Sequence, residues 1–428
     1  MGTLDTYGFD VNDIIDRFGG DVAKLLKRMN FNDCVDKEMK KMDKLNIINI
    51  GKTGVGKSTI INAVFGQELA RTGIGAPVTE HCDSYRIDGS PITIYDSKGL
   101  ETGNSAGVLA EIYEVIERQN RRSNTKEYIH ICWYCVLDDG NRLDENEVRI
   151  INDIRRIIPV IIVLTQSAKG EKTQTFMTQI RQCFLSNPID IVPIMAVPKV
   201  VQSDVSDVNI RAHGLDALVN RSYDLLPESV AKTFAAFQNV NIELKVEHAQ
   251  KATLAYSGAV AAAAIIPLPI ADSIIMTAIQ ISMMAHITVC FGVSSRLNYK
   301  NIIAGLGGPL AGAFIGTNIA SWLKAIPGVG TLTGMVIGAS VGAPITYALG
   351  TVYTRALAYL SKNGGKINEA AIIDALKEAA KNINMAEIKK EWEKNKNRCS
   401  EAESEDILRE AKSADSPLRV FWPDRKKP

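Results

Sequence analysis

Between residues 44 and 226, short apolar runs alternate with amphipathic segments. Uninterrupted Val- and Ile-rich runs are typical of strands buried on both faces of a parallel sheet, and here they predict strands at Leu45–Ile50, Tyr128–Leu137, Val160–Thr165 and Ile189–Val197. Segments with helical spacing separate these runs. The pattern predicts an α/β domain with a mostly parallel sheet and helices on both faces.

Outside this domain the apolar spacing is helical throughout. Residues 1–43 predict an N-terminal helical segment, and 227–362 predict an all-α domain rich in Gly and Ala. One helix is expected from Glu228 to about Ile265. Residues 363–428 predict a charged helical tail, so the expected domains are 1–43, 44–226, 227–362 and 363–428.

The helical domain is unusually poor in charge. From Ala252 to Thr354 there are only four charged side chains, Asp272, Arg296, Lys300 and Lys324. Its uncharged stretches are long enough to span a bilayer, but small residues also let helices pack closely. Three interpretations stay open: a tightly packed bundle, hydrophobic hairpins inserted in a membrane, or a bundle that opens onto a membrane when the other domain switches.

Overall composition narrows the class of partner. The 428 residues carry 49 Lys and Arg against 48 Asp and Glu, a net charge of +1, which counts against nucleic-acid binding driven by bulk charge. Seven dispersed cysteines and the absence of an apolar leader favour a cytoplasmic location, peripheral to a membrane or inserted in it. Cys132 and Cys135 lie on opposite faces of a predicted strand, which counts against a metal or redox pair.

A glycine-rich motif follows the first strand and opens a helix. Such a loop turns its backbone N–H groups toward phosphates. The lysine would reach the β- and γ-phosphates, and the hydroxyl after it would bind Mg²⁺. The expected nucleotide-binding residues here are Gly51, Lys52, Thr53, Gly54, Val55, Gly56, Lys57, Ser58 and Thr59.

Three further residues follow in the order that phosphoryl chemistry needs. Thr79 is a candidate switch threonine for Mg²⁺ and the γ-phosphate. Asp96 ends a strand in an Asp-Ser-Lys-Gly sequence and would hold the Mg²⁺ shell, while the Gly99 N–H would meet the γ-phosphate. The candidate catalytic residues are therefore Lys57, Thr79 and Gly99, and the candidate metal ligands are Ser58, Thr79 and Asp96.

With these motifs, residues 45–225 resemble the Era-like and septin-like P-loop GTPases. The resemblance implies GTP and GDP as ligands, with Mg²⁺. In that family an Asn/Thr-Lys-x-Asp motif reads guanine, and the matching residues here are Thr165, Gln166, Ser167 and Ala168. Thr165 fits, but the carboxylate is replaced by Ala168, so the motif does not itself decide between GTP and ATP. The backbone near Ala196 is another candidate for base recognition.

The residue after Gly99 also departs from a common pattern. Leu100 stands where Ras-like enzymes place a glutamine that orients water. A hydrocarbon side chain cannot do this, so we expect slow intrinsic hydrolysis, raised by a partner or by pairing of two G domains in a homodimer.

Residues 240–362 resemble a second family, a Gly/Ala-rich helical domain of unknown function found after bacterial GTPase domains. The motifs that carry this resemblance are Ile265–Asp272, Gln280 with Met283, Ile326–Gly330 and Tyr347–Gly350. It implies a regulatory GTPase associated with a membrane.

Three functions are consistent with these features. The first is a GTP-hydrolysing switch whose nucleotide state controls the hydrophobic helical domain, at a membrane lipid surface and with a dimer or another partner. The alternative is an assembly or effector protein that perturbs membranes with little hydrolysis. The third is a ribosome- or RNA-associated GTPase, against which the near-zero net charge counts.

Overall fold

The structure is a computed structural model. It describes residues 31–66, 76–79, 82–97, 110, 113–114, 116–117, 128–140, 142–201, 208–263, 271–293, 339–364, 367–381, 385–396 and 401–412. The chain forms two compact units: Met42–Asn241, called the α/β unit here, and a helical unit that joins Ile242–Pro428 to the segment ending at Lys41.

A seven-stranded sheet forms the centre of the α/β unit, in the order β2-β3-β4-β1-β5-β6-β7. Its strands are β1 (Leu45–Gly51), β2 (Ala76–Thr79), β3 (Cys82–Arg86), β4 (Ile92–Ser97), β5 (Ile131–Leu137), β6 (Val160–Thr165) and β7 (Asp190–Ile194). The pairs from β4 to β7 are parallel, whereas β2 and β3 add an antiparallel edge. A separate hairpin pairs β8 (Lys199–Val201) with β9 (Val208–Ile210).

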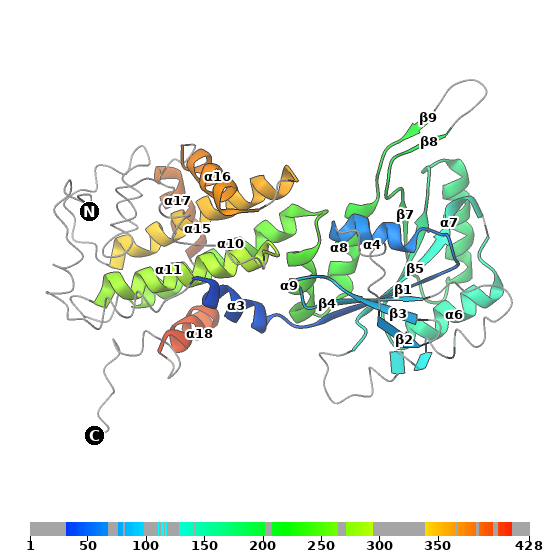
Figure 1. The fold of residues 1–428 in the computed structure, drawn as a ribbon, viewed down its shortest axis with the longest axis horizontal. Helices are drawn as coiled ribbons and strands as arrows, with labels where there is room; N and C mark the ends of the chain where they lie inside the picture. The colour runs from blue at the N-terminus through cyan, green and yellow to red at the C-terminus, as the bar shows by residue number, and fades with distance from the viewer. Residues whose placement is uncertain are drawn as a thin grey trace. The chain divides into compact units, whose positions relative to one another are not determined.

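Helices cover both faces of this sheet (Figure 1). They are α4 (Lys57–Phe65), α6 (Glu145–Arg155), α7 (Glu171–Cys183), α8 (Leu215–Leu225) and α9 (Glu228–Phe237). On one face, α6 and α7 pack on side chains such as Tyr134. On the other, Trp133 packs with Phe65 of α4 and Phe234 of α9, and its Nε1 donates to Ser222 Oγ of α8. The predicted parallel α/β fold is confirmed.

The helical unit is built around three long helices that pack on one another (Figure 1). They are α10 (Ile242–Ala263), α11 (Ala271–Cys290) and α15 (Ala339–Lys362), joined by α3 (Phe31–Lys41), α16 (Glu369–Lys381), α17 (Met385–Asn395) and α18 (Glu401–Lys412). A Cβ on Gly350 of α15 would lie 2.5 Å from Thr253 of α10, so a small residue sets this close approach. The region after the α/β domain is helical, as predicted.

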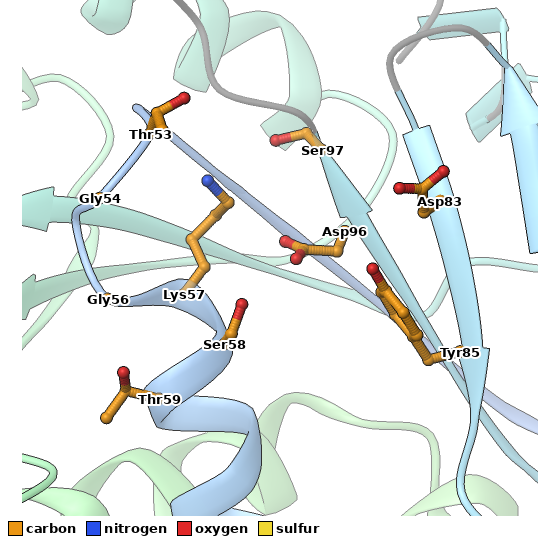
Figure 2. Close-up of a pocket in the computed structure, with 10 residues that line it drawn as sticks. All are labelled: Thr53, Gly54, Gly56, Lys57, Ser58, Thr59, Asp83, Tyr85, Asp96 and Ser97. Carbon is orange, nitrogen blue, oxygen red and sulfur yellow. The ribbon is translucent and has the colours of Figure 1, made fainter. Parts of the chain in front are cut away.

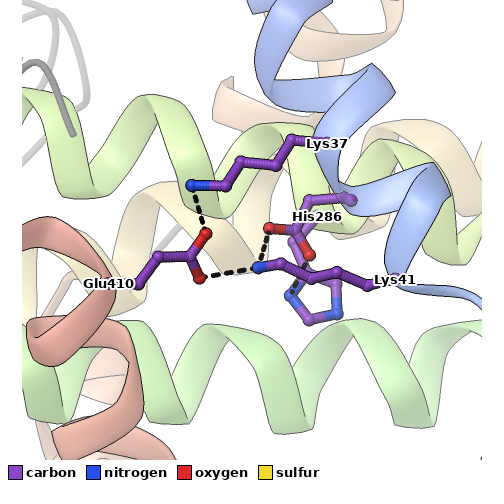
Figure 3. A network of polar contacts seen from close by, with 5 residues as sticks. Lys37, Lys41, His286 and Glu410 are labelled. Atoms are coloured by element: carbon purple, nitrogen blue, oxygen red, sulfur yellow. Dashed lines mark hydrogen bonds and ion pairs between the residues drawn. The ribbon is translucent and has the colours of Figure 1, made fainter. Parts of the chain in front are cut away.

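A charged cluster ties α3 to α11 and α18 (Figure 3). Lys41 Nζ lies 2.7 Å from both Glu38 Oε1 and Glu410 Oε2. His286 Nδ1 lies 3.6 Å from Glu38 Oε2, and Lys37 pairs with Glu410. Glu38 is buried while its partners are more exposed, so the cluster satisfies a carboxylate that the helix packing removes from water.

The limits of the two units differ from the boundaries that the sequence predicts. Where the sequence predicts boundaries at residues 43 and 226, the structure places α3 with the helical unit and α9 with the α/β unit. The prediction of one continuous helix from Glu228 to about Ile265 is wrong, because the chain forms two helices, α9 and α10, with a break between them. Gln238 fills this break: its Oε1 accepts from the N–H groups of Val240 and Asn241, and its Nε2 donates to two carbonyls.

The low-charge region is described only in part, since 264–270 and 294–338 lie outside the described residues. Within the described ranges, no helix combines the length and the apolar character that crossing a membrane requires. Polar side chains in α11 and α15 pair with one another instead: Gln280 Nε2 donates to Thr346 Oγ1 at 2.9 Å, and the hydroxyls of Thr288 and Tyr353 lie 2.8 Å apart.

Candidate nucleotide-binding site

The glycine-rich loop connects the central strand β1 to helix α4. Every residue of β1 is buried, so the loop begins from a fixed point in the core. A Cβ on Gly51 would lie 2.4 Å from the Cys135 carbonyl oxygen of β5, where φ of Gly51 is +156°. Only glycine fits this close approach to the neighbouring strand. Asn49 further fixes the helix start, since its Nδ2 donates to Lys57 O at 3.2 Å.

Lys57 is the buried cation of this loop. Its Nζ donates to the carbonyl oxygens of Gly51 at 2.9 Å and Lys52 at 3.1 Å, which folds the side chain back over the loop. The residue is only 8% exposed. Burial lowers the pKa of the Lys57 ammonium, and the nearby Asp96 carboxylate opposes this shift. The geometry places one positive charge where a phosphate lying against the loop would need it.

The loop borders a hollow of about 490 Å³. Figure 2 shows Lys57, Ser58 and Asp96 facing this space from α4 and the end of β4. Sequence reasoning missed two further lining residues, Asp83 and Tyr85, which come from the antiparallel strand β3. Only the strand register could have revealed them, because Asp83 pairs directly with Asp96.

The oxygen donors in the hollow fit Mg²⁺. Asp96 Oδ1 is buried and has no hydrogen-bond partner, so its lone pairs are left for a cation or for a water bound to one. The hydroxyl of Ser58 offers a second oxygen. In the described part of the chain no group of three or more His, Cys, Asp or Glu side chains could hold a metal. A cation here would therefore complete its shell with phosphate oxygens and water.

Burial raises the pKa of Asp96 to about 6, while Lys57 lowers it and Asp83 raises it. Desolvation therefore outweighs the lysine, and a cation at this carboxylate would favour its ionised form. The structure thus holds an acid with an incomplete set of partners next to the phosphate loop.

The second residue of the loop is tied to the start of α6. Lys52 Nζ lies 3.4 Å from Asp144 Oδ2 and 3.3 Å from Glu147 Oε2. These two acids also form the capping box of α6, in which each accepts a backbone N–H of the other. Because Lys52 is 43% exposed, the pairing orients the loop more than it stabilises the fold.

A second hollow, of about 230 Å³, shares Gly56 and Thr59 with the first. Thr165 and Gln166 at the end of β6 line it, together with the segment from Ile194 to Lys199. Thr165 is buried and its Oγ1 donates to Val136 O. The two hollows therefore adjoin at Gly56 and Thr59, in the loop and α4.

The predicted site residues fall into three groups. Thr53, Gly54, Gly56, Lys57, Ser58, Thr59 and Asp96 line the first hollow, and Thr165 and Gln166 line the second. Gly51, Lys52 and Val55 complete the loop between them. Thr79 is the last residue of β2, and Gly99 and Leu100 lie outside the described residues.

A Gly51→Ala substitution tests the loop's packing. We expect it to lower the free energy of unfolding of the α/β unit by about 1–3 kcal/mol, because the new methyl group overlaps the Cys135 carbonyl. Urea unfolding of the full chain measures this change. Gly170→Ala is the matched control, since a Cβ there meets nothing within 4 Å. Equal stability of the two variants would contradict the close approach.

Comparison with known proteins identifies relatives of this region. Residues 46–166 match the model of a family described as 50S ribosome-binding GTPase. Human septin-12 is 24% identical over 203 residues, 41% of this chain and 56% of the septin. Magnetosome membrane protein 22 of Magnetospirillum gryphiswaldense is 35% identical over 115 residues, 26% of this chain and 56% of that protein. GTPase Der of Caldicellulosiruptor saccharolyticus is 26% identical over 148 residues, 34% of this chain and 30% of that protein. The chain spans about half the length of the first two relatives and less than a third of GTPase Der.

Proposed function

We propose that the chain is a GTP-hydrolysing switch protein whose nucleotide state controls its helical unit. The match of residues 46–166 to a GTPase family model, and the likeness to septin-12 and GTPase Der, support this proposal. The observation that carries the proposal is the position of Lys57, which is buried over the loop and lines the same hollow as Ser58 and the unpartnered Asp96 Oδ1. A buried cation beside an incomplete oxygen shell is suited to a triphosphate with Mg²⁺.

Each residue then has a defined role. Lys57 contacts the β- and γ-phosphates, and the N–H groups from Thr53 to Thr59 surround them. Ser58 and Asp96 would hold Mg²⁺, which neutralises charge on the phosphate oxygens when it is bound. Thr79 would close on the metal and the γ-phosphate, and the Gly99 N–H would meet the γ-phosphate. Thr165 and Gln166 border the base.

Hydrolysis by the isolated chain is expected to be slow. Leu100 has no polar atom to orient the attacking water. A partner, or a second copy paired through the same domain, would then supply the missing group. Turnover per molecule that stays flat as the protein concentration rises would remove the support for self-pairing.

Two short connections give the switch a route to the helical unit. The three residues 42–44 join α3 of the helical unit to β1, which leads directly into the phosphate loop. The four residues 238–241 join α9 of the α/β unit to α10. A shift of the loop can reach the helices through such short links, because few residues are left to absorb it.

A membrane is the proposed place of action. The low-charge composition of 252–354 supports this, as does the likeness to a protein named as a magnetosome membrane protein. We expect the full-length protein to float with liposomes in the presence of a non-hydrolysable GTP analogue and to remain at the bottom with GDP. Flotation with both nucleotides would contradict nucleotide control, and flotation with neither would contradict the membrane.

The control for flotation is Lys57→Met, which removes the phosphate contact. This variant is expected to behave identically with both nucleotides. A wild-type response to nucleotide in this variant would show that the nucleotide acts from elsewhere.

Ribosome binding is a second candidate, because the matching family model carries that description. The net charge of +1 offers no bulk attraction to RNA. Co-sedimentation with ribosomes that weakens as salt rises would favour this candidate over the membrane.

A further inference from the structure

The second hollow, which is proposed to hold the base and is called the base hollow here, carries positive charge and, in the part of the chain that the structure describes, no negative charge. Of the described residues that line it, none carries a carboxylate and one carries a positive charge, Lys199. This residue begins β8, where it pairs with Ile210 of β9. The β8–β9 hairpin therefore contributes a lysine to this hollow.

A specific contact directs Lys199 toward Gln166, the residue that follows β6. Its Nζ donates to Gln166 Oε1 at 3.1 Å. Gln166 has a left-handed backbone, with φ of +54°, a conformation that non-glycine residues adopt rarely and often at functional sites. Both side chains are exposed, so their hydrogen bond is weak and can rearrange around a ligand.

Hydrogen bonds to the residue after Gln166 hold the loop that follows β6 in place. The N–H of Ser167 donates to Ile194 O at 2.9 Å, and His213 Nε2 lies 3.0 Å from Ser167 O. The same residue, His213, pairs through its backbone with Met195. A ligand in the hollow therefore meets a rigid backbone with two adaptable side chains at its end.

We propose that Lys199 is a specificity-determining residue that reads the O6 and N7 acceptors of guanine. This inference rests on the proposed function and names how its substrate base is selected. An ammonium has three N–H donors, of which Gln166 takes one, so two remain for the base. Guanine offers two neighbouring acceptors on this edge, whereas adenine places an amino donor beside N7.

This mode of recognition has a consequence for the opposite edge of the base. A carboxylate would accept hydrogen bonds from N1 and from the 2-amino group of guanine, but Ala168 replaces it. The 2-amino group is then not read. Inosine diphosphate, which keeps O6 and N7 and lacks that group, should bind nearly as tightly as GDP.

Competition binding with GDP, IDP and ADP tests the inference on the full chain. For the wild type we expect GDP and IDP to differ by less than threefold, and ADP to bind at least tenfold more weakly than GDP. In Lys199→Met the ratio of GDP to ADP affinity should fall below threefold, mainly through loss of GDP binding. Lys199→Arg should restore the ratio, because a guanidinium also donates to O6 and N7.

Lys172→Met serves as the charge-matched control, because Lys172 is an exposed lysine on α7 that lines neither hollow. It should leave all three affinities unchanged. IDP binding more than tenfold weaker than GDP would overturn the inference, since another acceptor would then read the 2-amino group. Equal losses of GDP and ADP affinity in Lys199→Met would also overturn it, by showing attraction to the phosphates alone. Failure of the wild type to bind any of the three nucleotides would instead refute the proposed function.

Discussion

Replacing Lys57 with Met is expected to lower the rate of GTP hydrolysis by about 10²- to 10³-fold, the usual loss when one preorganised donor to a developing charge is removed. Methionine has nearly the same length, so the change removes the charge and keeps most of the volume. The Nζ hydrogen bonds to Gly51 O and Lys52 O are lost together with the contact to phosphate. Phosphate release from a single turnover measures the effect.

Two observations make this result interpretable. Lys172→Met removes an exposed lysine from the same unit and should hydrolyse GTP at the wild-type rate. Urea unfolding should show Lys57→Met folded, because removing a buried cation lowers the desolvation cost even as two carbonyls lose a donor. Hydrolysis within threefold of the wild type by a folded Lys57→Met protein would refute the proposed catalytic role.

The sheet could be predicted because its signal is local. Strand β6, Val160–Thr165, is predicted with the same bounds that the structure has, since six consecutive apolar or β-branched residues are buried on both faces. The phosphate loop is equally local, as its glycines, Gly51, Gly54 and Gly56, lie within one short stretch of sequence. In both cases the residues that decide the structure lie within about ten positions of one another.

The break at Gln238 could not be predicted, because helical spacing continues across it. A glutamine whose own side chain satisfies the backbone of a turn resembles an ordinary helix residue in sequence. The attachment of α3 to the helical unit was missed for another reason. It depends on pairs such as Lys41 with Glu410, which lie 369 positions apart.

The candidate site divides in the same way. Lys57, Ser58 and Asp96 follow from motifs, whereas Asp83 reaches the hollow only through the register of β3 with β4. Lys199 lies in the three-residue strand β8, which is too short for an apolar pattern to predict. Its importance follows from what the base motif lacks, a carboxylate at Ala168, together with the contact to Gln166.

A buried lysine gives the helical unit a measurable dependence on pH. Lys245 of α10 is 1% exposed, and its Nζ donates to Phe291 O at 3.3 Å. Burial lowers the pKa of Lys245 to about 7, against a smaller opposing effect of Cys290. In the unfolded chain a lysine titrates near 10.4. Between these values Lys245 binds more protons in the unfolded state, so its contribution to the free energy of unfolding rises with pH over this window.

Lys245→Met should remove this dependence. We expect the variant to be more stable than the wild type at pH 7, by less than the full desolvation cost because Phe291 O loses its donor. Its advantage should shrink by about 2–3 kcal/mol between pH 7.5 and 9.5, at about 1.4 kcal/mol per pH unit. Urea unfolding of the full chain, followed by circular dichroism at each pH, gives the difference between the two proteins and cancels groups that titrate in both.

Lys251→Met is the matched control on the same helix. Lys251 is 60% exposed and pairs with Glu247 at 2.8 Å, so its removal should change stability by less than about 1 kcal/mol. That change should stay small across the same pH range, because Lys251 is exposed and its removal uncovers no buried group. If the difference in stability between Lys245→Met and the wild type were equally independent of pH, the prediction would be wrong. The Lys245 ammonium would then have to remain charged inside the folded helical unit over this pH range.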